Sequence, residues 1–305
     1  MAKARHLAPD PSEAGGDMAA FQAAVHWSLG SMDSVFLQDA NSLIMPPKDL
    51  IRVLEHLKKR FPWVRRITSY ARSHTVARIS DDHLSAMASA GLNRIHIGLE
   101  SGSDRVLKKV KKGVDKATQI KAGQKIKTAG MALSEYVMPG LGGRSLSEEH
   151  ATETADALNQ IDPDFIRLRT LAVPNGSPLV EQIAAGEFEK MTDVETAAEI
   201  RRFIHALEGI TSRIVSDHIL NLFEEVEGRL PEDKPRMLDA LDRFLTLDAE
   251  EQMLYQVGRR LGLFSRIDEL SLDNRRRRAE QACRQFGITP SNVDETIDEL
   301  MRQFI

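Results

Sequence analysis

The sequence predicts an α/β protein built on a parallel sheet of about five strands and followed by an all-helical C-terminal region. The first observation is that, between residues 17 and 175, short apolar runs alternate with amphipathic stretches of ten or more residues. Such alternation is typical of βαβ units, whose strands run parallel. The second is that strand-like runs stop beyond Pro178, and residues 190–305 have the pattern of one helix after another.

Each expected element has a local reason. Pro47 suits the first turn of a helix, where its missing N–H is not needed, and Ser80 is a suitable N-cap. Gly91 and Gly130 follow two helices, because glycine readily takes the conformation that ends a helix. Strands are expected at 34–39, 66–71, 93–99, 132–138 and 164–170. Helices are expected near 17–29, 47–60, 80–90, 103–111, 115–129 and 145–159.

The chain divides into three expected regions. Residues 1–16 are rich in Pro, Gly, Ala and Ser, which predicts a flexible tail. Residues 17–178 hold the alternating strands and helices, and residues 179–305 form the helical C-terminal region. With 305 residues the chain is long enough to bury a sizeable core.

Composition excludes several classes of protein. The content of 42% hydrophobic and 28% charged residues is that of an ordinary globular protein. The sequence contains no run of about 18 apolar residues, so no membrane span is predicted. The N-terminus also lacks the apolar segment of a secretory signal, so we expect a cytoplasmic protein. The net charge of −4 argues against a nucleic-acid partner and leaves a small molecule or another, unnamed substrate.

The chain contains a single cysteine, Cys283. One thiol excludes an internal disulfide and a zinc site of the CxxC…CxxC kind. It also excludes an iron–sulfur cluster held by this chain alone, since such clusters normally need at least three thiolates. No metal site is predicted.

Charged residues interrupt the expected strands, although strands of a parallel sheet usually read as continuous Val, Ile and Leu. Period-two alternation places His96 and Glu100 on one face of their strand, and Arg167 and Arg169 on one face of theirs. Because buried unpaired charges are costly, these faces either line a polar ligand cavity or form structural ion pairs. Glu135 or Glu100 is the expected partner of the arginines.

Five blocks of sequence follow one another at the spacing of βα units: VFLQDANSL, RITSYARSHTV, IHIGLESGSDRVLKKVKKG, LSEYVMPGLGG and DFIRLRTL. Together they resemble the radical S-adenosylmethionine (radical SAM) superfamily, and most closely its Elp3, MiaB and oxygen-independent coproporphyrinogen oxidase branch. The resemblance covers about residues 30–175. It implies a partial, open TIM-type βα barrel, with S-adenosylmethionine and a [4Fe–4S] cluster as the cofactors of the family.

The resemblance also implies a cofactor-binding set at the carboxyl ends of the strands. In the family, the turn after the first of these strands holds the cofactor's amino group, polar groups after the third lie near its ribose, and a glycine-rich turn after the fourth lies near its adenine. Arginines on the last strand suit its carboxylate. The candidate residues are Asp39, Asn41, Ser69, Arg72, Glu100, Ser101, Met138, Gly140, Gly142, Arg167 and Arg169.

Each element also has a purely structural interpretation. Gly140–Gly143 is equally consistent with a simple strand-to-helix turn, and Ser101 or Ser103 with the N-cap of the next helix. No catalytic residue is assigned. The histidines expected at the surface or at helix caps are those at 74, 83, 150 and 218.

The chain departs from the family at one point. Family members hold their cluster with a CxxxCxxC loop after the first barrel strand, and this chain has no such loop. The matching segment would precede residue 17, so we expect an N-terminally truncated copy; an engineered deletion and a degenerate family member are the alternatives.

Three functional hypotheses follow. The first is a chain of radical SAM enzyme lineage, with an unnamed substrate and without its cluster ligands. The second is a cluster-free protein that binds S-adenosylmethionine or a nucleotide without radical chemistry. The third is an aldolase- or isomerase-type barrel that uses Glu100, His96 or Glu135 as acid–base groups.

Overall fold

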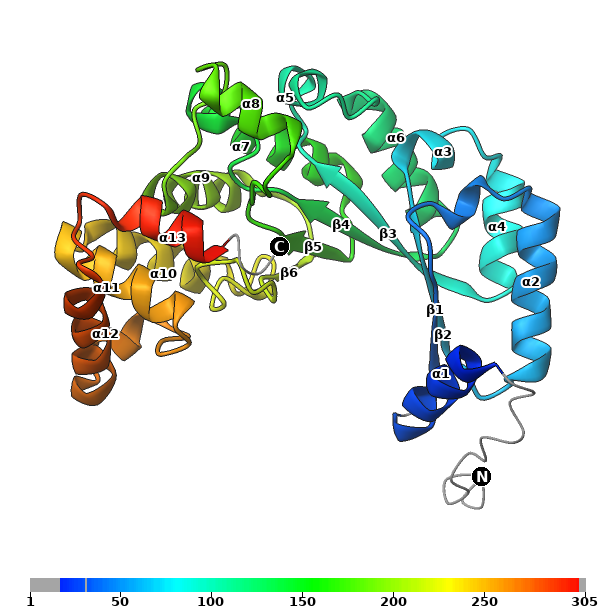
Figure 1. The fold of residues 1–305 in the computed structure, drawn as a ribbon. Helices are drawn as coiled ribbons and strands as arrows, with labels where there is room; N and C mark the ends of the chain where they lie inside the picture. Colours follow the sequence, from blue (N-terminus) through cyan, green and yellow to red (C-terminus); the bar gives the residue numbers. More distant parts are fainter. Residues whose placement is uncertain (1–16, 31, 302–305) are drawn as a thin grey trace.

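The computed structural model describes residues 17–30 and 32–301, which form one curved sheet with helices around it (Figure 1). The expected tail at 1–16 lies outside the described residues. The seven strands follow one another in sequence order; the first six are parallel and the seventh is antiparallel. The strands are β1 (Ser34–Leu37), β2 (Arg66–Ala71), β3 (Leu92–Glu100), β4 (Ala132–Val137), β5 (Phe165–Leu168), β6 (Arg213–Val215) and β7 (Gly228–Arg229).

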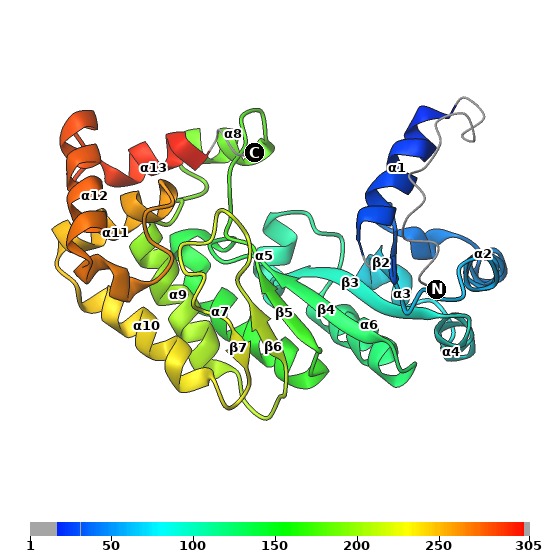
Figure 2. The ribbon, with the colours of Figure 1, turned by 90° about the horizontal axis from the view of Figure 1, so that it is seen from below.

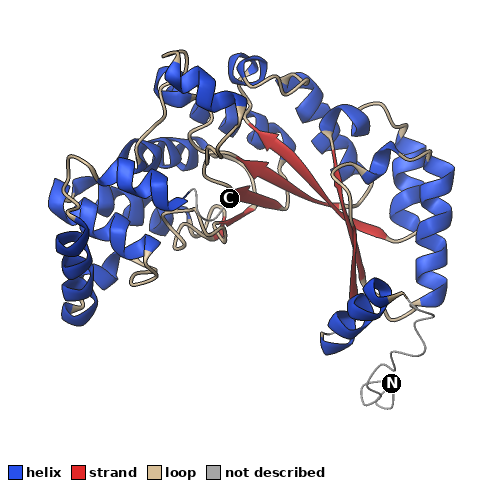
Figure 3. Cartoon of the chain, viewed as in Figure 1, coloured by secondary structure: helices blue, strands red, loops and turns tan. Residues whose placement is uncertain are grey.

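Helices precede, alternate with and follow the strands of this sheet. They are α1 (Met18–Leu29), α2 (Pro47–Arg60), α3 (Ser73–Val76), α4 (Asp81–Ser89), α5 (Asp104–Lys109), α6 (Lys116–Thr128), α7 (Gly143–Ile161), α8 (Pro178–Ala184), α9 (Asp193–Ala206), α10 (Lys234–Thr246), α11 (Ala249–Arg260), α12 (Asp273–Phe286) and α13 (Val293–Met301). The helices between the strands lie on the convex side (Figure 3). Seen from below, β3, β4 and β5 have no described helix in front of them (Figure 2). The concave side is therefore open, as expected of a partial βα barrel.

The predicted alternation of strands and helices is confirmed for residues 17–170. Pro47 is the first residue of α2, and the Ser80 hydroxyl accepts a hydrogen bond from the His83 amide to cap α4. α7 begins earlier than expected, at Gly143, because the preceding turn runs directly into the helix. The short helix α3 was not expected.

The expectation that strands stop beyond Pro178 is wrong. β6 extends the parallel sheet through the pair Ile166↔Ile214, and β7 pairs antiparallel with β6. β6 has three residues and β7 has two, and both are shorter than the roughly four to eight residues on which a period-two pattern depends. The rest of residues 179–301 is helices and connecting loops, and the boundary at 178/179 stays a prediction.

The two faces of the sheet differ in chemistry. On the convex face Ile95, Ile97 and Leu99 of β3 are buried in the main hydrophobic core, which the flanking helices complete. Successive residues of a strand point to opposite faces, so His96 and Gly98 lie on the concave face. Within the described residues, no helix has the length and apolar character needed to cross a membrane.

Candidate functional site

An aromatic row crosses the concave face. The parallel register pairs Tyr70 of β2 with His96 of β3 and places Phe36 of β1 and Tyr136 of β4 on the same face as these two residues. Their ring centroids are 5.0 Å apart for Phe36–Tyr70, 5.5 Å for Tyr70–His96 and 5.7 Å for His96–Tyr136. Phe36 is 36% exposed, and both tyrosines are half-buried. The open side of the sheet thus offers aromatic surface to a ligand.

Arginines lie beside this aromatic row. The Arg94 guanidinium lies 4.4 Å from the ring centroid of Phe165, and that of Arg169 lies 5.1 Å from the centroid of Tyr136. Burial and the charges of neighbouring arginines lower the pKa of Arg94. The Nε atoms of Arg94 and Arg167 are buried and have no hydrogen-bond partner in the described part of the chain. Such donors are costly to leave unpaired, so these arginines are suited to an anion.

His96 lies in the middle of the row and is 7% exposed. Burial, followed by the charges of Arg167, Arg94 and Arg169, lowers the pKa of His96 to about 4. The ring is therefore neutral at pH 7, and its buried Nδ1 has no hydrogen-bond partner among the described residues. Positive charge is concentrated on this face even though the chain as a whole carries −4.

Asp217, which follows β6, is the acidic partner of the two arginines of the last predicted strand. Its carboxylate accepts hydrogen bonds from Nη1 of Arg167 at 2.8 Å and from Nη1 of Arg169 at 2.9 Å. Burial opposes ionisation of Asp217, but the hydrogen bonds and charges of the two arginines outweigh it and lower its pKa. The expected partners, Glu135 or Glu100, are wrong, because Asp217 lies just after β6, a strand that the sequence pattern did not reveal.

Glu135 and Ser69 lie on the convex face instead. Glu135 is in register with Ile97 and Ile166, and burial raises its pKa to about 8. Ser69 is fully buried, and its hydroxyl donates to the carbonyl oxygen of Tyr70 at 3.1 Å. Both side chains are therefore separated from the concave face by the sheet itself, and we leave them out of the candidate site.

At the carboxyl edge, the turn after β1 is tied to the turn after β2 by Asn41. The Asn41 side chain accepts a hydrogen bond from the Arg72 amide and donates one to the Thr75 hydroxyl, each at 3.0 Å. Both ends of this amide are thus engaged within the protein. Asp39, with a φ of 134°, and the side chain of Arg72 remain exposed at the edge.

Glu100 ends β3 in a left-handed conformation, with a φ of 63°. Its carboxylate forms an ion pair with Lys112 and lies over Gly98: a Cβ atom at Gly98 would be 2.9 Å from Oε1 of Glu100. Glycine at position 98 therefore makes room on the concave face for this carboxylate.

The glycine-rich turn after β4 is held from several sides. The Met138 amide donates to the Glu100 carbonyl oxygen at 3.0 Å, which joins this turn to the end of β3. Gly140 has a φ of +87°, a conformation natural for glycine, and its amide donates to Oε1 of Glu199 at 2.7 Å. Gly140 and Gly142 are buried, and Met138 is half-buried.

His150, expected at the surface or at a helix cap, is buried within α7 and is 2% exposed. Its Nδ1 lies 2.8 Å from the Ser101 hydroxyl and its Nε2 lies 3.1 Å from the Met138 carbonyl oxygen. The expectation is wrong because the partners come from distant turns. The position of His150 on the apolar side of α7, with Leu146 and Ala151, was a signal for its burial. Glu199, which accepts the Gly140 amide, lies 59 residues from Gly140 and has no comparable local signal in the sequence.

The candidate residues thus separate into two groups. Those with side chains at the open edge or on the concave face are Asp39, Arg72, Glu100, Arg167 and Arg169. The half-buried Met138 packs against the apolar cluster that contains Leu141 and Leu171. Those buried within the protein are Asn41, Ser69, Ser101, Gly140 and Gly142.

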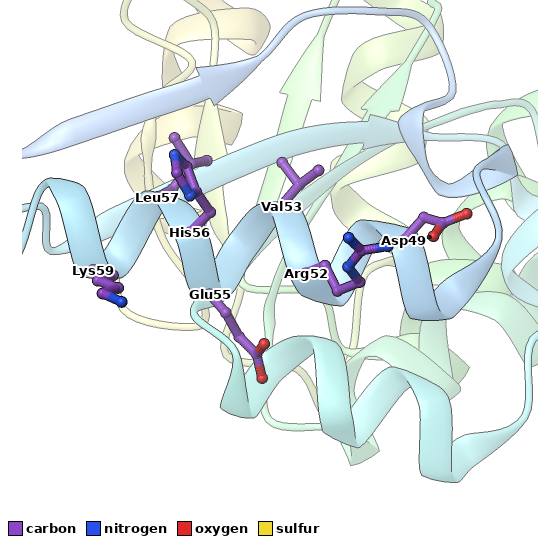
Figure 4. Close-up of a pocket in the computed structure, with 7 residues that line it drawn as sticks. All are labelled: Asp49, Arg52, Val53, Glu55, His56, Leu57 and Lys59. Atoms are coloured by element: carbon purple, nitrogen blue, oxygen red, sulfur yellow. Dashed lines mark ion pairs between the residues drawn. The ribbon is translucent and has the colours of Figure 1, made fainter.

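A surface depression of about 660 Å³ lies along α2, away from both groups. It is lined only by residues of that helix, from Asp49 to Lys59, and their side chains project in several directions (Figure 4). No predicted site residue contributes to it, so we do not assign a function to it.

The fold is that of an open βα barrel, and several of the candidate residues lie at its carboxyl edge. Residues 18–155, a little under half of the chain, match the family model of the radical SAM superfamily. Over that segment the chain is similar to this superfamily, as its sequence blocks predicted.

Two curated relatives and one solved structure are similar to parts of this chain. The tRNA uridine(34) acetyltransferase of Methanocaldococcus infernus is 28% identical over 117 residues, which is 38% of this chain and 22% of that protein. The enzyme of the same name from Methanocaldococcus jannaschii is 26% identical over 39% of this chain and 22% of its own length. The chain thus aligns with about a fifth of these relatives. The solved structure of Methanocaldococcus infernus Elp3 with an N-terminal deletion superposes with a TM-score of 0.50 at 19% identity, over 65% of this chain and 52% of that one.

The residues present do not fit a [4Fe–4S] cluster. Cys283 is the single cysteine of the sequence, and it is buried in α12, where burial raises the pKa of its thiol. Among residues 17–30 and 32–301 no group of three potential His, Cys, Asp or Glu ligands comes together.

Proposed function

We propose that this chain binds S-adenosylmethionine at the carboxyl edge of its sheet and a nucleotide on the concave face beside it. The observation that carries the proposal is the combination, on one open face, of an aromatic row with arginines whose buried Nε atoms lack partners among the described residues. Aromatic rings stack with bases, and arginine forks bind phosphates. A ligand that is both planar and anionic satisfies both features.

The donor set at the edge fits the chemistry of S-adenosylmethionine. Asp39 offers carboxylate oxygens to its ammonium group. Glu100 offers acceptors to the ribose hydroxyls, which would replace Lys112 as the partner of its carboxylate. Arg72 and Arg169 are suited to its carboxylate. When bound, the cofactor supplies an electrophilic sulfonium centre next to the concave face.

A nucleotide substrate agrees with the relatives, whose names state that they act on a tRNA uridine. The net charge of −4 made a nucleic-acid partner unexpected, but local fields and not the total charge decide where an anion binds. Free nucleotides and nucleotides within RNA share this chemistry, and binding experiments with each distinguish them.

The aldolase or isomerase alternative finds no support. It needs acid–base groups that converge on one substrate, yet Glu135 and His96 lie on opposite faces of the sheet. Glu100 is engaged by Lys112 at the edge.

Calorimetric titration with S-adenosylmethionine tests the cofactor half of the proposal. We expect saturable binding by the full chain, weakened about tenfold by Glu100→Gln, which removes a charged acceptor. The matched control is Glu55→Gln, at an exposed position of α2, which should leave the dissociation constant unchanged. Absence of binding, or equal affinity of the Glu100→Gln variant, contradicts this half.

Titration with uridine monophosphate, uridine, inorganic phosphate and a short single-stranded RNA tests the substrate half. The nucleotide should bind more tightly than either of its parts, and Arg94→Gln should weaken it about tenfold. Arg52→Gln on α2 is the control, since Arg52 is exposed on the convex side. Equal affinities for inorganic phosphate and uridine monophosphate, or an unchanged affinity in Arg94→Gln, would reject the proposed nucleotide site. A higher affinity for the RNA than for uridine monophosphate would assign the site to RNA.

A further inference from the structure

Two turns at the carboxyl edge are connected beneath the surface by His150 of α7. The Ser101 hydroxyl lies 2.8 Å from Nδ1 of His150, and the Met138 carbonyl oxygen lies 3.1 Å from Nε2. Ser101 belongs to the turn 100–103 after β3, and Met138 begins the turn 138–143 after β4. The imidazole ring therefore connects the two turns, in addition to the backbone hydrogen bond from the Met138 amide to the Glu100 carbonyl oxygen.

The partners fix the tautomer of this ring. A carbonyl oxygen only accepts hydrogen bonds, so Nε2 of His150 carries the proton and donates it to Met138. Nδ1 then accepts a hydrogen bond from the Ser101 hydroxyl, whose oxygen in turn accepts one from the Ser103 amide at 3.0 Å. Burial lowers the pKa of His150, which keeps the ring in this neutral form. The chain of hydrogen bonds runs in one direction, from turn to turn.

Glu199 fixes the second turn from another helix. It belongs to α9, outside the segment that matches the family model, and is 2% exposed. Its Oε1 accepts the Gly140 amide at 2.7 Å and lies 3.7 Å from Nε2 of His150. Its Oε2 has no hydrogen-bond partner among the described residues. A buried carboxylate with so few partners is unfavourable for stability, so a purely stabilising role does not explain it.

We propose that His150 and Glu199 are positioning residues, which hold the turns 100–103 and 138–143 in the relative arrangement that receives the ligand. The inference rests on the proposed function, because it assumes that these turns contact S-adenosylmethionine. Glu199 restrains the backbone of Gly140, and His150 couples Met138 to the turn of Ser101. Neither side chain is exposed, so both act through the turns and not on the ligand.

The experiment compares two substitutions of Glu199 in the full chain. Glu199→Gln keeps an oxygen for the Gly140 amide, whereas Glu199→Leu removes it; Ile204→Val, on the same helix, is the control for a small loss of packing. We measure the S-adenosylmethionine dissociation constant by calorimetry and the exchange rate of the Gly140 amide by hydrogen–deuterium exchange, with thermal melting to verify folding. Glu199→Leu should raise the dissociation constant and the exchange rate of the Gly140 amide about tenfold each. For Glu199→Gln and Ile204→Val, both quantities should stay within about threefold of those of the unsubstituted chain. His150→Phe, which removes the hydrogen bonds of the ring to Ser101, Met138 and Thr154, is the second variant if Glu199→Leu does not fold, and it should also weaken binding.

The two measurements separate the possible failures. Faster exchange at Gly140 with an unchanged dissociation constant would overturn the inference, because the turn would then be held without serving the ligand. An unchanged exchange rate of the Gly140 amide in Glu199→Leu would overturn the role of Glu199 itself. An equal loss of affinity in Glu199→Gln, Glu199→Leu and Ile204→Val would show that the effect is a loss of packing and not of the hydrogen bond to Gly140. If the unsubstituted chain does not bind S-adenosylmethionine, the proposed function fails, and with it the ligand-directed part of this inference; the exchange data still decide whether Glu199 holds the turn.

Discussion

The Arg169 guanidinium lies 5.1 Å from the ring centroid of Tyr136 and at the same time donates a hydrogen bond to Asp217 at 2.9 Å. The arginine is thus held over the aromatic row by a carboxylate that competes with any anionic ligand. Because Asp217 is half exposed, the ion pair contributes little to stability, about 1 kcal/mol or less.

Replacing this carboxylate should therefore strengthen anion binding. Asp217→Asn removes the competing charge from Arg167 and Arg169, and we expect uridine monophosphate to bind about threefold to tenfold more tightly. Titration calorimetry at constant ionic strength measures the change. Weaker binding would mean that Asp217 orients the arginines for the ligand more than it competes with it.

His96 should make the protein sensitive to acid. Its pKa of about 4 in the folded chain lies below the ordinary value of 6.5, so between these values the unfolded chain takes up the proton first. The free energy of unfolding should fall as the pH drops from 6.5 to 4, by about 3 kcal/mol in total. Urea unfolding across this range should show a smaller decrease for His96→Gln than for the unsubstituted chain. His205→Gln, at an exposed position, is the control; identical pH dependence in all three proteins would contradict the neutral, buried His96.

Glu135 should make the protein less stable as the pH rises, which is the opposite of the pH dependence expected from His96. Burial raises its pKa from 4.5 to about 8, so the unfolded chain loses the proton first and stability falls as the pH rises from 4.5 to 8. Glu135→Gln should remove this loss, on the order of 3–5 kcal/mol between pH 4.5 and 8. Thermal melting of the variant and of Glu148→Gln, an exposed control on α7, measures it. If Glu135→Gln stabilises the protein equally at pH 4.5 and pH 8, ionisation of Glu135 is not the cause of the stabilisation.

Gly98→Ala tests the placement of Glu100. The new Cβ would lie 2.9 Å from Oε1 of Glu100 and 3.2 Å from Nζ of Lys112. Because these are the far ends of flexible side chains, they can move at little cost to folding, about 1 kcal/mol. The affinity for S-adenosylmethionine should fall about threefold or more, whereas Gly30→Ala, where a Cβ has ordinary space, should not change it. Unchanged affinity of Gly98→Ala would place the cofactor away from Glu100.

The elements of the barrel could be predicted from the sequence because each carries its own local signal. Pro47, Ser80 and the period-two apolar runs of β2, β3 and β4 depend on neighbours a few residues away. β6 and β7 could not, because strands of two or three residues are defined by their pairing partners and not by a repeating pattern.

The site was predictable only in part, for the same reason. Alternation correctly placed His96 opposite Ile95 and Ile97, and Arg167 opposite Ile166, and the resemblance predicted the turns. The partners that fix those turns, Asp217 and Glu199, come from beyond the expected barrel, 48 and 59 residues from Arg169 and Gly140. Tertiary pairing over such separations leaves no trace in spacing or composition.

A crystal structure of the chain with S-adenosylmethionine and uridine monophosphate tests the proposed function most directly. We predict the uracil ring against the aromatic row of Phe36, Tyr70 and Tyr136 with its phosphate at Arg94 or Arg167, and the cofactor between Glu100 and the turn 138–143. Ligands bound elsewhere, for example in the depression along α2, or an empty concave face at saturating concentrations of both ligands, would contradict it.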